Sequence, residues 1–98
     1  MWTTDRIVQL LNTSDRAVER AVVAIYQRQT ADEQAASVTC HDNTVGFSGC
    51  DAIRGSYWAR LIMRGYHLYP DKLAKARKMV VKYRRQLTEI ANAKETGR

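Results

Sequence analysis

The stretch from Pro70 to Lys94 constrains the fold most, because it contains no glycine and no further proline. Pro70 fits the first turn of a helix, and Asp71 places a carboxylate near the positive end of the helix dipole. Apolar residues then recur at intervals of three or four, the spacing of one buried helix face. They are Leu73, Ala76, Val80, Tyr83, Leu87, Ile90 and Ala91. The pattern predicts one continuous helix over 71–94.

The same stretch carries the net charge of the chain. From Asp71 to Arg85 there are seven Lys/Arg residues against one carboxylate, whereas the remaining residues carry nine of each sign. At about 100° per residue, four of these cations fall within roughly 80° of one another, on the side opposite the apolar stripe. They are Lys75, Lys78, Lys82 and Arg85. Like charges four residues apart repel, so a helix face of one sign indicates an anionic partner.

Three interpretations of this basic face are open: it binds DNA or RNA, it binds an acidic protein surface, or it is a solvated face without a partner. Aromatic side chains beside the helix favour nucleic acid, because bases stack on them. Tyr57 and Trp58, by contrast, have the spacing of core residues. Asp71 would repel phosphate at the helix N-terminus, so contact with the phosphate backbone is expected rather than readout of bases. The predicted binding residues are Lys72, Lys75, Lys78, Lys82, Arg85, Tyr66 and Tyr69.

The length of 98 residues is that of one domain. One proline and five glycines leave few turns, which favours helices over a many-stranded sheet. The longest apolar run, residues 21–26, is far shorter than the ~20 residues of a membrane span. No charged-then-apolar leader opens the chain, so we expect a cytoplasmic protein with no membrane partner. We expect a single helical domain over 1–95 and a C-terminal tail over 96–98.

Local start and stop signals divide the rest of the chain. Thr3 or Thr4 can cap a first helix, and the break at Asn12-Thr13-Ser14-Asp15 can cap a second. Gly65 ends the helix before the basic one. Apolar positions of that third helix cover about half of its circumference, which predicts a central helix packed on more than one side.

A capping-box spacing of Thr30 and Glu33 predicts a bend at residues 29–30 and a new helical turn. Glu19 and Arg20 are expected on a solvated outer face. Val45 and Phe47 are the expected core anchors of the loop that follows. Together these signals predict an all-α domain with helices over 4–12, 14–29, 50–64 and 71–94, a short helical turn over 31–36 and an ordered loop over 38–49.

Four side chains are possible zinc ligands: Cys40, His41, Cys50 and His67. Their spacing fits no familiar zinc motif, and two cysteines in a cytoplasmic protein favour free thiols. The adjacent Cys40 and His41 lack a third group to orient them as nucleophile and base. Asp42 and Asp51 are explained as turn and cap residues, and no Lys-Ser/Thr pair follows the glycines at 46 and 49. We therefore expect no metal, no cofactor and no catalytic residue, that is, a protein that is not an enzyme.

Three segments resemble a known pattern: RQTADEQ at 28–34, VGFSG at 45–49 with Asp51-Ala52, and KYRRQL at 82–87. Their order and spacing are similar to a small module that recurs in bacteriophages, plasmids and other mobile elements. That module is also found beside or within helicase-like proteins of DNA metabolism. The resemblance covers residues 14–93 and brings no agreed catalytic residues. This chain departs from the pattern at Cys40, Thr44 and Cys50.

The resemblance implies a non-catalytic, nucleic-acid-associated accessory protein of a phage or mobile element. The alternative is a phage-encoded inhibitor that binds a host or defence nucleoprotein through its basic and aromatic surface. A third interpretation is a homodimer in which the long helix pairs with its copy.

Overall fold

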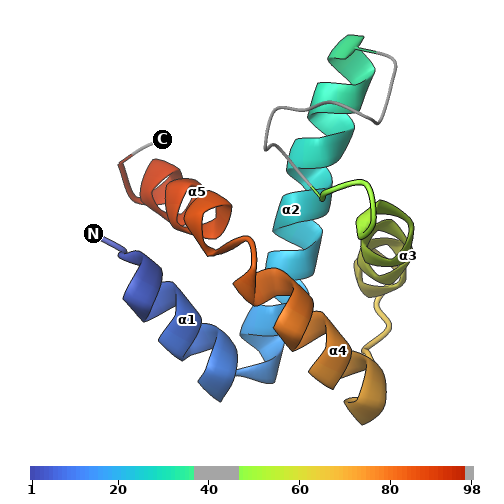
Figure 1. Ribbon diagram of the computed structural model, residues 1–98, viewed down its shortest axis with the longest axis horizontal. Coiled ribbons are helices and arrows are strands. Elements are labelled where there is room, and N and C mark those ends of the chain that lie inside the picture. The colour runs from blue at the N-terminus through green and yellow to red at the C-terminus, as the bar shows by residue number, and fades with distance from the viewer. Residues whose placement is uncertain (37–46, 97–98) are drawn as a thin grey trace.

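The computed structural model describes the backbone of residues 1–36 and 47–96, and the side chains of residues 1–28 and 47–94. These residues form five helices: α1 (Thr4–Thr13), α2 (Asp15–Ala36), α3 (Ala52–Met63), α4 (Pro70–Val81) and α5 (Arg84–Thr96), shown in Figure 1. The prediction of a small all-α domain is confirmed. Most of the predicted loop over 38–49, including Val45, lies outside the described residues.

Predicted start and stop signals occur where expected. Thr3 Oγ1 accepts a hydrogen bond of 3.2 Å from the Arg6 N–H at the start of α1. Ser14 Oγ accepts one of 3.2 Å from the Ala17 N–H at the start of α2. Gly65 follows α3 with φ +99°, a left-handed conformation that glycine adopts without steric cost. These caps satisfy backbone groups that have no partner within the helix.

The predicted bend at residues 29–30 is wrong, because α2 continues without interruption to Ala36. Residues 29–36 contain no glycine or proline and are rich in alanine, glutamine and glutamate, which favour helix. A capping-box sequence inside such a stretch does not end the helix, since the backbone hydrogen bonds can simply continue.

The prediction of one helix over 71–94 is also wrong. The chain leaves α4 after Val81 and begins α5 at Arg84. At the break the backbone makes tight turn bonds, from Lys82 N–H to Met79 O at 3.1 Å and from Tyr83 N–H to Val80 O at 2.9 Å. The break turns α5 away from the direction of α4, so that α5 lies beside α1 (Figure 1).

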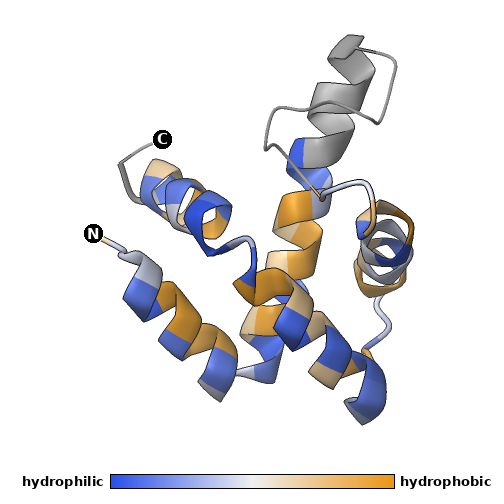
Figure 2. Cartoon of the chain, in the orientation of Figure 1, coloured by the Kyte–Doolittle hydropathy of each residue, from blue (hydrophilic) through white to orange (hydrophobic). Residues whose placement is uncertain are grey.

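The core is organised around α2, which contacts each of the other four helices. Val18, Val22 and Ile25 of α2 are completely buried, together with Val80 of α4. In Figure 2 the middle of α2 is an apolar stretch flanked by the other helices. At the N-terminus, Trp2 and Asn92 exchange two hydrogen bonds, of 2.8 and 3.1 Å, which join the beginning of the chain to α5.

A buried carboxylate holds the connection between α3 and α4. Glu19 is 8% exposed, so the expected solvated position is wrong. Its Oε2 accepts a hydrogen bond of 2.9 Å from the Leu68 N–H, and its Oε1 lies 3.0 Å from Nδ1 of His67. Leu68 is itself buried, and its backbone N–H needs an acceptor there. The Glu19 carboxylate therefore fixes the position of residues 64–69.

We predict that Glu19→Ala lowers the free energy of unfolding by about 1–3 kcal/mol, since it leaves the buried Leu68 N–H without an acceptor. Glu19→Gln keeps an oxygen that can accept this bond and should lose clearly less. The exposed neighbour supplies the control, because Arg20→Ala should change stability by less than about 0.5 kcal/mol. Urea unfolding followed by circular dichroism measures all three. Equal stability of Glu19→Ala and Arg20→Ala would contradict this role for Glu19.

Candidate functional site

Three of the predicted binding lysines form an open row on α4. Lys72, Lys75 and Lys78 are exposed, while Ala76 and Val80 of the same helix are buried against the core. Among the described residues, none of the three lysines forms an ion pair. In Figure 2 the first turns of α4 are mostly hydrophilic, and its last turn is apolar. This row keeps its charge available to an external partner.

Lys82, by contrast, is part of a cluster of hydrogen bonds around Asp51. Its Nζ lies 2.7 Å from Asp51 Oδ2, and the same oxygen accepts a hydrogen bond of 2.6 Å from the Tyr83 hydroxyl. Tyr83 in turn accepts a bond of 2.9 Å from the Ser48 N–H, and its ring meets Phe47 edge to face at 5.7 Å. We call Ser48, Asp51, Lys82 and Tyr83 the Asp51 junction. Lys82 thus serves to join the start of α3 to the turn between α4 and α5.

Electrostatics at the Asp51 junction favour the ionised carboxylate. Burial would raise the pKa of Asp51, but the hydrogen bonds from Lys82 and Tyr83 and the charge of Lys82 outweigh burial and hold the pKa below 3.8. The hydrogen bond to Asp51 raises the pKa of Lys82. Burial, and then the bond to Asp51, raise the pKa of Tyr83 above its usual value of 10.0. The described contacts of this cluster join the start of α3 to the turn between α4 and α5.

The predicted Arg85 is separated from the α4 lysines by the break at residues 82–83. It lines a hollow of about 480 Å³ together with Arg28, Arg84 and Glu89. Arg28 is ion-paired to Glu89 at 3.3 Å across this hollow. The structure therefore places Arg85 on α5, outside the row of α4 lysines.

Both predicted tyrosines are exposed, Tyr66 by 61% and Tyr69 by 76%. They lie in the connection that Glu19 holds in place, and Tyr69 is the residue that caps α4 without a side-chain cap bond. Two aromatic rings are thus presented beside the first turn of the lysine-bearing helix.

The structure adds an exposed face of α3 that the sequence interpretation assigned to the core. Trp58 is buried as expected, but Tyr57 is 56% exposed and Ile53 86% exposed, so the expectation of a helix packed on more than one side is wrong. Arg60 and Arg64 share this exposed side, while the exposed Arg54 lies beside it, with its guanidinium over the Trp58 ring at 5.8 Å. No carboxylate occurs between residues 52 and 70. This exposed face could have been predicted from the sequence, because two of the four positions that share it are arginines. The four positions, at helical spacing, are Ile53, Tyr57, Arg60 and Arg64.

We define the α3–α4 surface as the exposed cations and tyrosines of α3, α4 and their connection. Its members are Arg54, Tyr57, Arg60, Arg64, Tyr66, Tyr69, Lys72, Lys75 and Lys78. None of these cations is ion-paired among the described residues, and the exposed carboxylate within this segment is Asp71. Elsewhere Arg28, Arg77 and Lys82 all form ion pairs. In Figure 1, α3, the connection and the first turns of α4 lie along one edge of the molecule, and α4 then runs towards its centre.

Of the possible metal ligands and nucleophiles, Cys40, His41 and Asp42 lie outside the described residues. Cys50 is an exposed free thiol with its Sγ 3.4 Å from Ser48 Oγ. His67 is held by Glu19. Across residues 1–28 and 47–94, no three His, Cys, Asp or Glu side chains come together as a metal site would require.

Comparison with known proteins gives no match for this chain among family models, curated proteins or solved structures. No helix within the described part of the chain is long and apolar enough to cross a membrane.

We predict that Asp51→Asn lowers the free energy of unfolding by about 1.5–3 kcal/mol at pH 7, the usual worth of hydrogen bonds to a charged group. A carboxyl whose pKa is depressed by folding stabilises the protein above its unfolded pKa of about 3.9, and this stabilisation is lost as the pH falls through the lower folded value. The difference between wild type and variant should therefore shrink below about pH 4.

Urea unfolding at pH 7 and at several values below pH 4 measures this difference. The exposed Asp71 provides the control, since Asp71→Asn removes a carboxylate that interacts only with the N-terminus of α4, worth less than about 1 kcal/mol. A difference between wild type and Asp51→Asn that stays constant with pH would contradict the proposed charge on Asp51.

Proposed function

We propose that this protein binds nucleic acid through the α3–α4 surface, as a non-catalytic accessory protein of a phage or mobile element. The observation that carries the proposal is that residues 54–78 expose six cations and three tyrosines against one carboxylate, Asp71. None of these six cations has a carboxylate partner among the described residues. The resemblance to a module found near DNA-metabolism proteins supports the same conclusion.

Unpaired cations at helical spacing slightly lower the stability of the isolated protein, because like charges repel. Bound phosphate groups would neutralise these cations and so remove the repulsion between them. Binding also releases counterions from the nucleic acid, which adds to the affinity. From Lys72 to Lys78 the α4 axis advances by roughly 9 Å at ~1.5 Å per residue. That length matches the axial rise of roughly three nucleotides of one strand at ~3.4 Å each.

The aromatic residues extend the same proposal to single strands. Tyr66 and Tyr69 are exposed beside the first turn of α4, so bases of a strand held by the lysines can stack on their rings. Stacking of this kind tolerates any base, which suits a protein whose other contacts are to phosphate.

The charge test uses the triple variant Lys72→Glu/Lys75→Glu/Lys78→Glu. We expect its affinity for a labelled 20-nucleotide single strand to fall at least tenfold near 100 mM salt. The slope of log K against log salt should fall by roughly 0.7 for each lost phosphate contact, about 2 in total. Fluorescence anisotropy over a salt series measures both quantities, and circular dichroism verifies the fold.

A matched variant with the same change in net charge is Arg16→Glu/Arg20→Glu/Lys94→Glu, whose cations lie on α2 and α5. It should bind within about threefold of wild type. Equal losses in both variants would show that only net charge matters and would refute a surface site. Flat traces for single- and double-stranded DNA and RNA at low salt would also refute the proposal and favour the inhibitor alternative, with its protein partner.

The tyrosines predict a strand preference. Tyr66→Ala/Tyr69→Ala should weaken binding of single strands by about 1–3 kcal/mol for each base that loses its stack, and leave duplex binding within about threefold. The control is Tyr66→Phe/Tyr69→Phe, which keeps both rings and should bind as wild type does. Equal losses for single strands and duplexes, or a loss in the Phe variant, would contradict a stacking role.

A further inference from the structure

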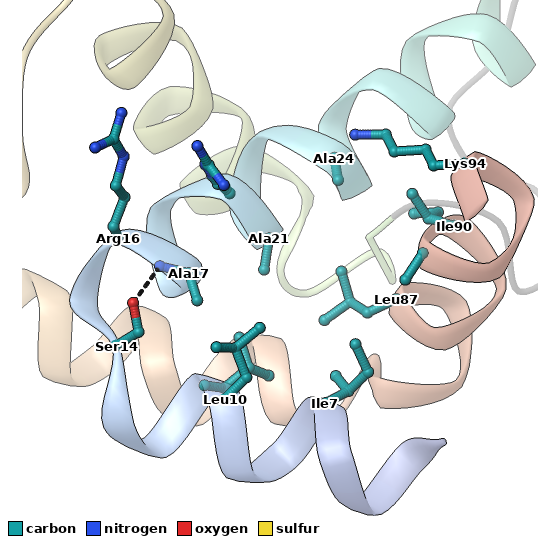
Figure 3. A pocket seen from close by; sticks show the side chains of 13 residues that line it. Ile7, Leu10, Ser14, Arg16, Ala17, Ala21, Ala24, Leu87, Ile90 and Lys94 are labelled. Carbon is teal, nitrogen blue, oxygen red and sulfur yellow. Dashed lines mark hydrogen bonds between the residues drawn. The ribbon is translucent and has the colours of Figure 1, made fainter. Parts of the chain in front are cut away.

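An apolar groove lies between α1, α2 and α5, away from the α3–α4 surface (Figure 3). Its volume is about 280 Å³. Apolar side chains from all three helices form its floor: Leu10 from α1, Ala17, Ala21 and Ala24 from α2, and Leu87 and Ile90 from α5. We call this hollow the α1–α2–α5 groove.

The groove exists because α2 presents small side chains at helical spacing to its two neighbours. Ala17, Ala21 and Ala24 lie four and three residues apart, on one face of α2. Larger residues there would fill the space between α1 and α5. Instead Leu10 remains 38% exposed at the groove.

Three cations stand along this apolar floor. Arg16 and Arg20 of α2 and Lys94 of α5 line the groove, and no carboxylate among the described side chains lines it. None of the three cations forms an ion pair among the described residues. The same three side chains also line a neighbouring hollow of about 450 Å³ that extends towards Ile62 and Met63 of α3.

We propose that the α1–α2–α5 groove binds an acidic amphipathic helix of a partner protein. Two or three apolar side chains of one helix face would occupy the floor, as in other helix-in-groove complexes. Carboxylates beside that face would meet Arg16, Arg20 and Lys94. This site is independent of the nucleic-acid proposal, since it uses none of the same residues.

Charge and shape select this occupant over others. The chain carries a net charge of +6, so a second copy is a poor match for a groove bordered by cations. The volume of about 280 Å³ is just below the range of roughly 300–1,000 Å³ in which drug-sized ligands bind. An open floor of aliphatic side chains also suits aliphatic anchors better than it suits the bases or phosphates of a nucleic acid.

The experiment selects peptides from a display library of helical 16-residue sequences. Apolar residues are fixed at positions 3, 6, 7 and 10, roughly the anchor spacing of groove-bound helices, and Glu, Gln or Lys is allowed elsewhere. Selection uses the whole chain, and enriched peptides are synthesised and titrated by fluorescence anisotropy. We expect acidic peptides to be enriched and to perturb the NMR amide signals of Leu10, Ala21 and Ile90.

Variants separate the groove from general attraction to a basic protein. Arg16→Glu/Arg20→Glu/Lys94→Glu should weaken the selected peptides at least tenfold, and Ala24→Leu, which fills the floor without a change of charge, should weaken them at least fivefold. Lys72→Glu/Lys75→Glu/Lys78→Glu has the same charge change elsewhere and should bind within about threefold of wild type. Circular dichroism verifies that each variant is folded.

Three outcomes would overturn the proposal. The library yields no peptide that binds more tightly than 1 mM; both triple variants lose binding equally; or dodecanoate saturates the same amides at lower concentration than any peptide does. The last result would assign the groove to an anionic amphiphile of low molecular weight. None of these outcomes bears on the test of the α3–α4 surface, which is measured with nucleic acid.

Discussion

The hydrogen bond from the Tyr83 hydroxyl to Asp51 joins segments that are far apart in the chain, the start of α3 and the turn between α4 and α5. Lys82 adds an ion pair to the same carboxylate oxygen. The spacing of apolar residues would fit one straight helix from Pro70 onwards. At this junction, however, the chain turns after Val81, and α5 packs on α1 and α2. The groove between these three helices and the separation of Arg85 from the α4 lysines both follow from that turn.

The basic residues between Lys72 and Lys82 fall into two groups, those that contact other helices and those that face outwards. Lys82 is held by Asp51, and Arg77 donates to the Leu11 carbonyl oxygen and to Asp15, so that α4 is fixed to the junction of α1 and α2. These cations are partly desolvated and have carboxylates placed for them. Lys72, Lys75 and Lys78, on the outer side of the same helix, have none. Which basic residues are available to a partner is therefore decided by their direction from the core.

The buried contact between Glu19 and the Leu68 N–H sets the position of the exposed residues Tyr66 and Tyr69. Glu19 reaches from the second turn of α2 to the Leu68 N–H, where an unsatisfied donor would raise the free energy of the folded state. The contact holds the connection between α3 and α4 against the core, and Tyr66 and Tyr69 on either side of Leu68 are left exposed. The position of the two tyrosines thus depends on one buried carboxylate in α2.

Much of the local structure was determined by the sequence itself, because caps and stops depend on short-range hydrogen bonds and backbone preferences. Thr3, Ser14, Gly65 and Pro70 all act where the sequence predicts. The apolar periodicity also identified the buried side of the last two helices, since Ala76, Val80, Tyr83 and Leu87 are all in the core. Four features were decided by tertiary structure alone: the break at residues 82–83, the burial of Glu19, the exposure of Tyr57 and the pairing of Lys82. Each depends on a partner distant in the chain, and the spacing of residues along one helix carries no information about such partners.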